Sequence, residues 1–103
     1  MSHTPGPWFR DGKTVYALEH AGYKKGHEMH RNRFSLRVTS DYEQESEANT
    51  RLIAAAPELL DALREFMDIW GSVDAEGDSK RAQRRRAEMW TKANAAIAKA
   101  EGR

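Results

Sequence analysis

The stretch RFSLRVTSDYEQESEANTRLIAAAP, residues 33–57, decides the fold because its hydrophobic period changes near residue 40. From Arg33 to Thr39, apolar and polar side chains alternate, which is typical of a β-strand with one buried and one solvated face. From Glu43 onward alanine, leucine and glutamate dominate, and these residues favour a helix. The change predicts strands first and helices second, and therefore an α+β fold rather than alternating β-strands and α-helices.

Upstream of this stretch, the sequence predicts two further strands. A short first strand is expected at residues 8–10, followed by a turn at Asp11-Gly12, which is a common hairpin signal. Residues 14–18 are rich in β-formers and predict a second strand. Residues 21–29 contain two glycines and many polar side chains, and we expect a loop there. With the strand at residues 33–39, the result is a small three-stranded antiparallel meander.

A first helix is expected over residues 43–55, directly after the last strand. Ser40 or Asp41 would be its N-cap, and the glutamates of its first turns favour the positive end of the helix dipole. Its apolar period predicts a buried side made of Ala48, Leu52 and Ile53.

Two further helices are expected after Pro57. This proline ends or kinks the first helix and suits the start of a second one, which Gly71 would end. An exposed linker over residues 72–79 and a long third helix over residues 80–100 follow. We expect the first two helices to form a hairpin that covers the sheet. The third helix would pack beside them or against a second copy of the chain.

Length and composition bound the class of protein. The 103 residues fit a single domain, with a β-rich part at residues 1–40 and a helical part at residues 41–103. Cysteine is absent, which excludes disulfides and thiolate chemistry and fits a reducing compartment. No N-terminal stretch has a signal-peptide pattern, and the longest apolar run, residues 52–57, is too short to span a bilayer. These features predict a cytoplasmic protein with no membrane contact.

Motifs for catalysis and for bound cofactors are missing from the sequence. There is no nucleophile elbow and no glycine-rich phosphate loop, so we expect no enzyme activity. The segment His27-Glu28-Met29-His30 places two imidazoles three residues apart, with a carboxylate between them. A third ligand at a matching spacing is missing, and the segment has the composition of a loop. The prediction is therefore no metal, no cofactor, and histidines that lie on the surface.

Two long motifs resemble those of a known group of proteins. HTPGPW at residues 3–8 and EANTRLIAAAPELL at residues 47–60 resemble motifs of a family of small phage and prophage proteins, and residues 93–102 resemble their alanine-rich end. The resemblance implies a bacteriophage accessory protein made in the host cytoplasm, and it implies no catalytic residue. Because phages encode many small proteins that disarm host defences, we expect a non-enzymatic inhibitor that binds a host protein.

A second hypothesis is that the chain sequesters a small anionic ligand such as a signalling nucleotide. Trp8 could stack on a base, Asn49 could bond a base edge, and Arg51 offers a planar fork for phosphate. The cations that would assist are Lys24, Lys25, Arg31 and Arg33. Each residue also has a structural interpretation: Trp8 closes one end of the core, Asn49 bridges to the N-terminal loop, and Arg51 pairs with an acid.

A third hypothesis is nucleic-acid binding through a basic cluster on the third helix. Five cations lie within seven residues, and they could contact phosphates: Lys80, Arg81, Arg84, Arg85 and Arg86. Against this, the net charge of the chain is only +1, and no aromatic residues alternate with the cations. A solvated helix face with Glu88 as a pairing partner is an equally good interpretation.

The long helices also predict self-association. Met67, Trp70, Met89 and Trp90 provide more apolar surface than a small sheet can cover. Because two-fold dimers are the commonest oligomers, we expect a homodimer.

Overall fold

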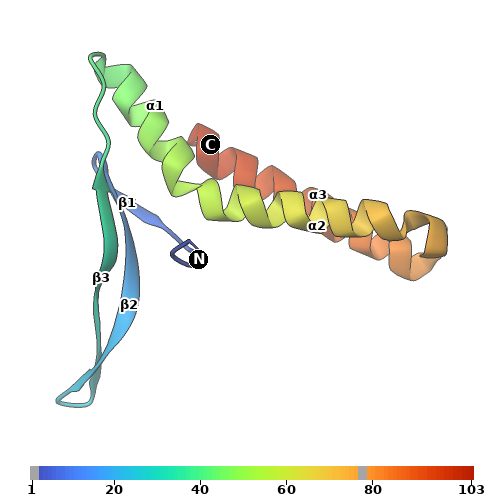
Figure 1. Cartoon of the computed structure of the whole chain (residues 1–103), viewed down its shortest axis with the longest axis horizontal. Helices are drawn as coiled ribbons and strands as arrows, with labels where there is room; N and C mark the ends of the chain where they lie inside the picture. Colours follow the sequence, from blue (N-terminus) through green and yellow to red (C-terminus); the bar gives the residue numbers. More distant parts are fainter. Residues whose placement is uncertain (1–2, 77–78) are drawn as a thin grey trace.

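The computed structural model describes residues 3–76 and 79–103. Three strands come first: β1 (Phe9–Asp11), β2 (Thr14–Lys24) and β3 (His27–Arg37). Three helices follow: α1 (Glu43–Ala54), α2 (Ala56–Glu76) and α3 (Lys80–Glu101). This order confirms the predicted α+β fold. Figure 1 shows that the β2–β3 ribbon and the α2–α3 hairpin extend in different directions from the region around α1.

The sheet is an antiparallel meander in the order β1-β2-β3, as predicted, but its strands are longer than expected. The predicted loop at residues 21–29 is wrong, because β2 continues to Lys24 and β3 begins at His27. The glycines that suggested a loop have other roles. Gly26, with φ 78°, lies in the tight turn, and Gly22, with φ 97°, lies where the pairing register shifts between His20 and Tyr23. Glycine adopts these positive φ values without a steric cost. The pairing of β2 with β3 therefore continues past the bulge as far as the turn.

The core lies where α1 packs against the sheet. Val15, Val38 and Ala54 form its buried centre, and partly buried hydrophobic residues surround them: Trp8, Phe34 and Ile53. The buried side of α1 is Ser46, Thr50 and Ala54. Of the predicted residues, Ile53 packs against the core, whereas Ala48 is exposed and Leu52 is 52% exposed. The two hydroxyl groups find local partners, since Thr50 Oγ1 donates to the Ser46 carbonyl oxygen at 2.7 Å and Ser46 Oγ donates to that of Ser40 at 3.4 Å.

The beginning and end of the helices also differ from the prediction. Tyr42, rather than Ser40 or Asp41, is the N-cap of α1, and it makes no side-chain capping bond. Helix α2 continues through Gly71 to Glu76, because a single glycine inside a helix costs only about 1 kcal/mol. At the start of α3, Ser79 Oγ accepts a hydrogen bond from the Ala82 N–H at 3.1 Å.

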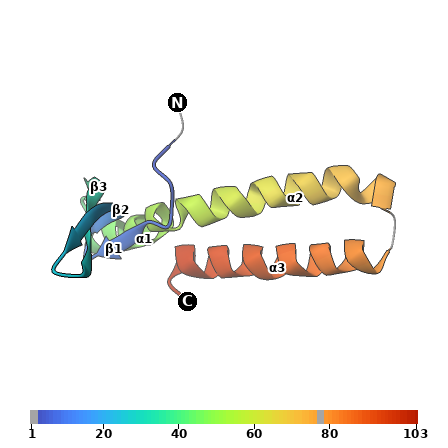
Figure 2. The ribbon, with the colours of Figure 1, turned by 90° about the horizontal axis from the view of Figure 1, so that it is seen from below.

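The helical hairpin consists of α2 and α3 rather than of the first two helices. Figure 2 shows these two helices running side by side, away from the sheet. Small and medium-sized side chains are buried along the hairpin: Ala62 and Ile69 of α2, and Ala82, Met89 and Ala96 of α3. The expected cover of the sheet by a helical hairpin is therefore wrong, because in the described part of the chain the helix that packs on the strands is α1. Within the described residues, none of the helices has the length and hydropathy needed to cross a membrane.

Candidate functional site: the apolar face of the helical hairpin

Trp8, a candidate for base stacking, packs into the protein. Its ring lies 5.0 Å from that of Phe34, centroid to centroid, and its Nε1 donates a hydrogen bond to the carbonyl oxygen of Thr4 at 3.1 Å. The ring also packs against the core. The contact with Phe34 and the hydrogen bond to Thr4 thus give the half-buried Trp8 ring a structural role.

Arg51 and Asn49 lie on α1, away from the other candidates. An Arg51 nitrogen, Nη1, lies 3.7 Å from Glu47, one helical turn earlier. The same side chain lies against the last turn of α3, where a Cβ added at Gly102 would come within 2.5 Å of Arg51 Cδ. Asn49 is half-buried on the same helix. Arg51 is therefore packed between two helices rather than free to receive a phosphate.

The four other cations of the anion hypothesis lie along the β2–β3 ribbon. Lys24 and Lys25 are at the turn, which Figure 1 shows at the end of the ribbon distant from α1. Arg31 Nε lies 2.6 Å from Glu19, and Arg33 Nε lies 4.0 Å from the same carboxylate. Lys24 and Lys25 thus lie at the turn of the ribbon, whereas Arg31 and Arg33 lie near Glu19 on its strands.

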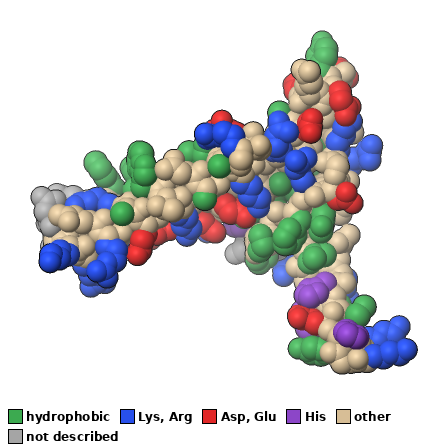
Figure 3. All heavy atoms as spheres, turned by 180° about the vertical axis from the view of Figure 1, so that it is seen from behind, with side chains coloured by type: hydrophobic (Ala, Val, Ile, Leu, Met, Phe, Trp, Pro, Cys, Tyr) green, Lys and Arg blue, Asp and Glu red, His purple; other side chains and the backbone are tan. Residues whose placement is uncertain are grey.

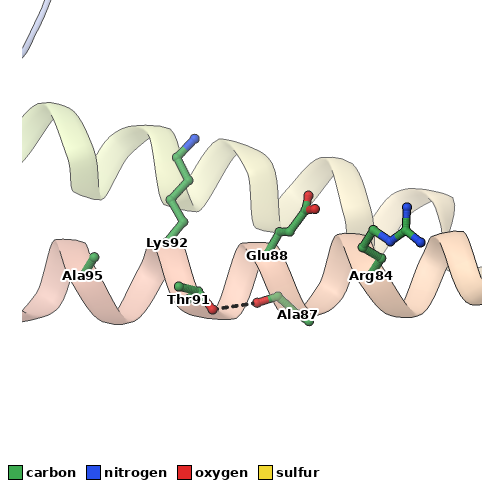
Figure 4. Close-up of a pocket in the computed structure, with 6 residues that line it drawn as sticks. All are labelled: Arg84, Ala87, Glu88, Thr91, Lys92 and Ala95. Carbon is green, nitrogen blue, oxygen red and sulfur yellow. Dashed lines mark hydrogen bonds between the residues drawn. The ribbon is translucent and has the colours of Figure 1, made fainter.

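The basic cluster lies on the first turns of α3, at the end of the hairpin distant from the sheet. Lys80, Arg81 and Arg84 are exposed, whereas Arg85 and Arg86 are half-buried. A shallow groove of about 410 Å³ continues from Arg84 along α3. Figure 4 shows Arg84, Glu88 and Lys92 following one another along one side of this helix. A carboxylate between two cations weakens the attraction of that groove for a phosphate chain.

Lys92 links this groove to α2. Its Nζ lies 2.8 Å from a carboxylate oxygen of Glu65. The hydrogen bond to Glu65, and then the negative charge of the same group, raise the pKa of Lys92 above its ordinary value. The cation is therefore held in an ion pair within the hairpin.

A continuous apolar surface covers one side of the α2–α3 hairpin. Six large hydrophobic side chains on it are more than two-fifths exposed: Leu63, Phe66, Met67 and Trp70 of α2, and Trp90 and Ile97 of α3. We call these six residues the hairpin face. Their spacing of three, four and seven residues places them on one side of each helix. Figure 3 shows hydrophobic side chains standing out along the helical arm.

A groove between the two helices lies within the hairpin face. It has a volume of about 350 Å³ and is lined by Leu59, Ala62, Leu63, Phe66, Ala93 and Ile97. Beside it, the rings of Phe66 and Trp70 stack at a centroid distance of 5.9 Å and an interplanar angle of 11°. Burial of one such side chain contributes about 1.5–3 kcal/mol, so a partner that covered this face would gain substantial binding free energy.

The sequence indicated this apolar stripe but assigned part of it the wrong role. We expected the apolar side of the second helix to cover the sheet, whereas in the structure it faces solvent. The sequence did indicate an excess of apolar surface on these helices, which we interpreted as a sign of self-association, and Trp70 and Trp90 are 71% and 67% exposed. Monomeric proteins rarely leave a large contiguous apolar patch uncovered, so the hairpin face is the candidate contact surface.

A cluster of possible metal ligands on the ribbon was not predicted from the sequence. His20, Glu28 and His30 each offer one ligand atom, and these three atoms lie within 4.8 Å of one another. Glu28 and His30 belong to the segment for which a third ligand had been missing. His20 supplies it from β2, because the segment is a strand rather than a loop.

Together, a short meander, a helical hairpin and an uncovered apolar face define a small α+β protein with a surface suited to binding. Residues 1–103, the whole chain, match the family described as Salmonella phage P22 protein Y8K6. The chain belongs to this family of phage proteins, which confirms the resemblance found in the sequence. The comparisons with curated proteins and with solved structures gave no match.

Proposed function

We propose that this phage protein is a non-enzymatic accessory protein that acts in the host cytoplasm by binding a host protein, as an inhibitor of a defence function. The observation that carries the proposal is the hairpin face, where Trp70 and Trp90 are 71% and 67% exposed. Tryptophan is enriched among the residues that dominate binding energy at protein interfaces. Membership of a phage family supports action on a host component.

The groove in the hairpin face suits a helix of the partner. A helix that is apolar on one side can pack into the groove between two antiparallel helices. The groove is lined by apolar side chains of both helices. The partner surface we propose is therefore the apolar side of an amphipathic helix.

Two other ligand classes receive less support. For a signalling nucleotide, Trp8 and Arg51 are engaged in packing, and Arg31 and Arg33 lie near Glu19. For a nucleic acid, Glu88 interrupts the basic side of α3. A nucleic-acid complex would lose affinity steeply with salt, whereas a complex formed mainly by apolar contacts would not.

The homodimer predicted from the sequence competes for the same surface. A second copy could pack its own hairpin face on this one and form a four-helix bundle. Sedimentation equilibrium of the purified chain at micromolar concentration shows whether the hairpin face binds a second copy of the chain. A monomer leaves the face free for a host protein, and a dimer that is lost on changing Trp70 and Trp90 assigns the face to self-association.

Photo-crosslinking inside host cells tests the proposal directly. A benzophenone amino acid replaces Met67 on the hairpin face, or Tyr23 on the ribbon as the control, since both side chains are largely exposed at 66% and 74%. We expect one host protein to be crosslinked from position 67 and not from position 23. Crosslinks from position 67 to the chain itself alone would contradict the proposal.

The purified partner then gives the decisive measurement. Trp70→Ser and Trp90→Ser should each weaken its binding at least about tenfold, because truncation of an interface hot spot costs 2 kcal/mol or more. The control is Tyr42→Ser, which removes an aromatic side chain that is 71% exposed but lies outside the hairpin face. Equal affinity of all three variants would show that the partner binds elsewhere.

A further inference from the structure

Three side chains near the outer part of the ribbon converge on one point. His20 of β2 pairs directly with His30 of β3, so the two side chains lie on the same face of the sheet. Glu28 precedes His30 by two residues, and alternation along the strand places it on that face as well. His20 Nδ1 lies 3.0 Å from Glu28 Oε1, and His30 Nε2 lies 3.3 Å from the same oxygen.

These distances are close to those between the ligands of one metal ion. Zinc binds imidazole nitrogen and carboxylate oxygen at about 2.0–2.2 Å, so two ligands at a tetrahedral angle lie about 3.4 Å apart. The three ligand atoms lie within 4.8 Å of one another. Small side-chain rotations would therefore bring all three to bonding distance of a common centre.

We propose that His20, Glu28 and His30 form a binding site for a divalent transition metal, with zinc as the preferred ion. Two imidazoles and one carboxylate favour zinc and its neighbours over calcium and magnesium, which prefer sites made of oxygen ligands alone. The three side chains are 48%, 52% and 46% exposed. A fourth position on the metal is thus open to water or to a ligand from a binding partner.

The local backbone holds the histidines in place. The register shift between His20 and Tyr23 contains Gly22, and such bulges re-aim neighbouring side chains. The Tyr23 ring packs edge-on against His20 at a centroid distance of 5.1 Å. The His20 and His30 rings lie 6.2 Å apart, centroid to centroid, and are nearly perpendicular at an interplanar angle of 83°. Figure 3 shows histidine side chains gathered towards the end of the ribbon.

A bound metal ion would link β2 to β3 in the part of the ribbon that lies beyond α1. A metal that binds the folded ribbon, and not the unfolded chain, stabilises the fold by mass action. The site is separate from the hairpin face, so it does not depend on the proposed function.

The test is a titration of the full-length, untagged chain with Zn²⁺ by calorimetry and with Co²⁺ by visible absorption. We expect one ion per chain and the absorption of a four-coordinate cobalt site. His20→Gln and His30→Gln should each lower the affinity at least about tenfold, since each removes one ligand. The matched controls are His3→Gln and His27→Gln, which remove the two histidines outside the cluster and should leave the affinity unchanged within about twofold.

Two results would overturn the proposal. One is an affinity for Zn²⁺ that falls equally in the cluster and control variants, which would indicate dispersed surface binding. The other is the absence of one-to-one binding in the parent chain. Circular dichroism of each variant verifies that the fold is retained, which we expect because all the replaced side chains are exposed.

Discussion

The ammonium group of Lys99 lies 2.7 Å from a carboxylate oxygen of Glu58, at the place where the three parts of the chain meet. The same ammonium group donates a hydrogen bond to the carbonyl oxygen of Trp8 at 3.1 Å. One side chain near the end of α3 thus holds the first turn of α2 and the segment that leads into the sheet. These residues lie within the motifs that resemble the phage family, so the motifs have a structural role.

Lys99→Met should destabilise the fold. It removes two charge-assisted hydrogen bonds in a partly exposed position and should lower the free energy of unfolding by about 1–2 kcal/mol. The control is Lys92→Met, which breaks an exposed ion pair between the same two helices and should cost less. Urea denaturation measures both variants. Equal losses would contradict the role assigned to the Lys99 contacts.

Gly6→Ala should also be destabilising, for a steric reason. A Cβ atom added at Gly6 would lie 2.6 Å from Pro57 Cβ, where the N-terminal segment crosses the start of α2. Overpacking of this kind costs about 1–3 kcal/mol. Thermal denaturation should show a lower midpoint for Gly6→Ala and a still lower one for Gly6→Val. An unchanged midpoint in both would mean that the segment does not pack there.

The position of the buried side of α1 can be tested by a matched pair of substitutions. Ala54 is 3% exposed, whereas Ala48 on the same helix is exposed. Ala54→Leu should cost about 1–3 kcal/mol through overpacking, and Ala48→Leu should change stability by less than about 0.5 kcal/mol. Urea denaturation again gives both values. The reverse order would restore the side of the helix that the sequence predicted.

The ion pair between Lys92 and Glu65 predicts a dependence of stability on pH. The hydrogen bond to Glu65 and then the charge of that group raise the pKa of Lys92 above its ordinary value in the folded state. The contribution is fully present below the unfolded-state pKa of about 10.4, and it is lost as the pH rises through the folded-state pKa. The difference in thermal midpoint between the parent and Lys92→Met should therefore be constant from about pH 7 to 9 and decrease above about pH 10.5. A decrease that begins near neutral pH would contradict this assignment.

The sequence predicted the class and order of the elements because these depend on local period and composition. It failed where the answer depends on tertiary distance. Leu52 is the larger and more apolar side chain, but Ser46 and Thr50 lie on the buried side of α1 and Leu52 is 52% exposed. The hairpin was assigned to the wrong helices because apolar period alone does not identify which partner a stripe will meet.

The two candidate sites also differ in how far local sequence predicts them. The apolar stripe that became the hairpin face was visible as period and as excess aromatic surface. The cluster of His20, Glu28 and His30 was not visible, because it depends on the cross-strand register and on an irregularity that glycine permits. Spacing along the chain had drawn attention to His27, Glu28 and His30, of which His27 lies outside the cluster.

The divergence of the ribbon and the hairpin gives the molecule an open outline of 48 × 43 × 28 Å. Its radius of gyration is 17.6 Å, whereas a compact domain of this length has a value of about 13 Å. A single chain of this shape will experience more hydrodynamic drag than a sphere of the same mass and will leave a gel-filtration column early. The elution volume of the monomer would therefore resemble that of a compact dimer. The molecular mass has to be measured by a method that does not depend on shape.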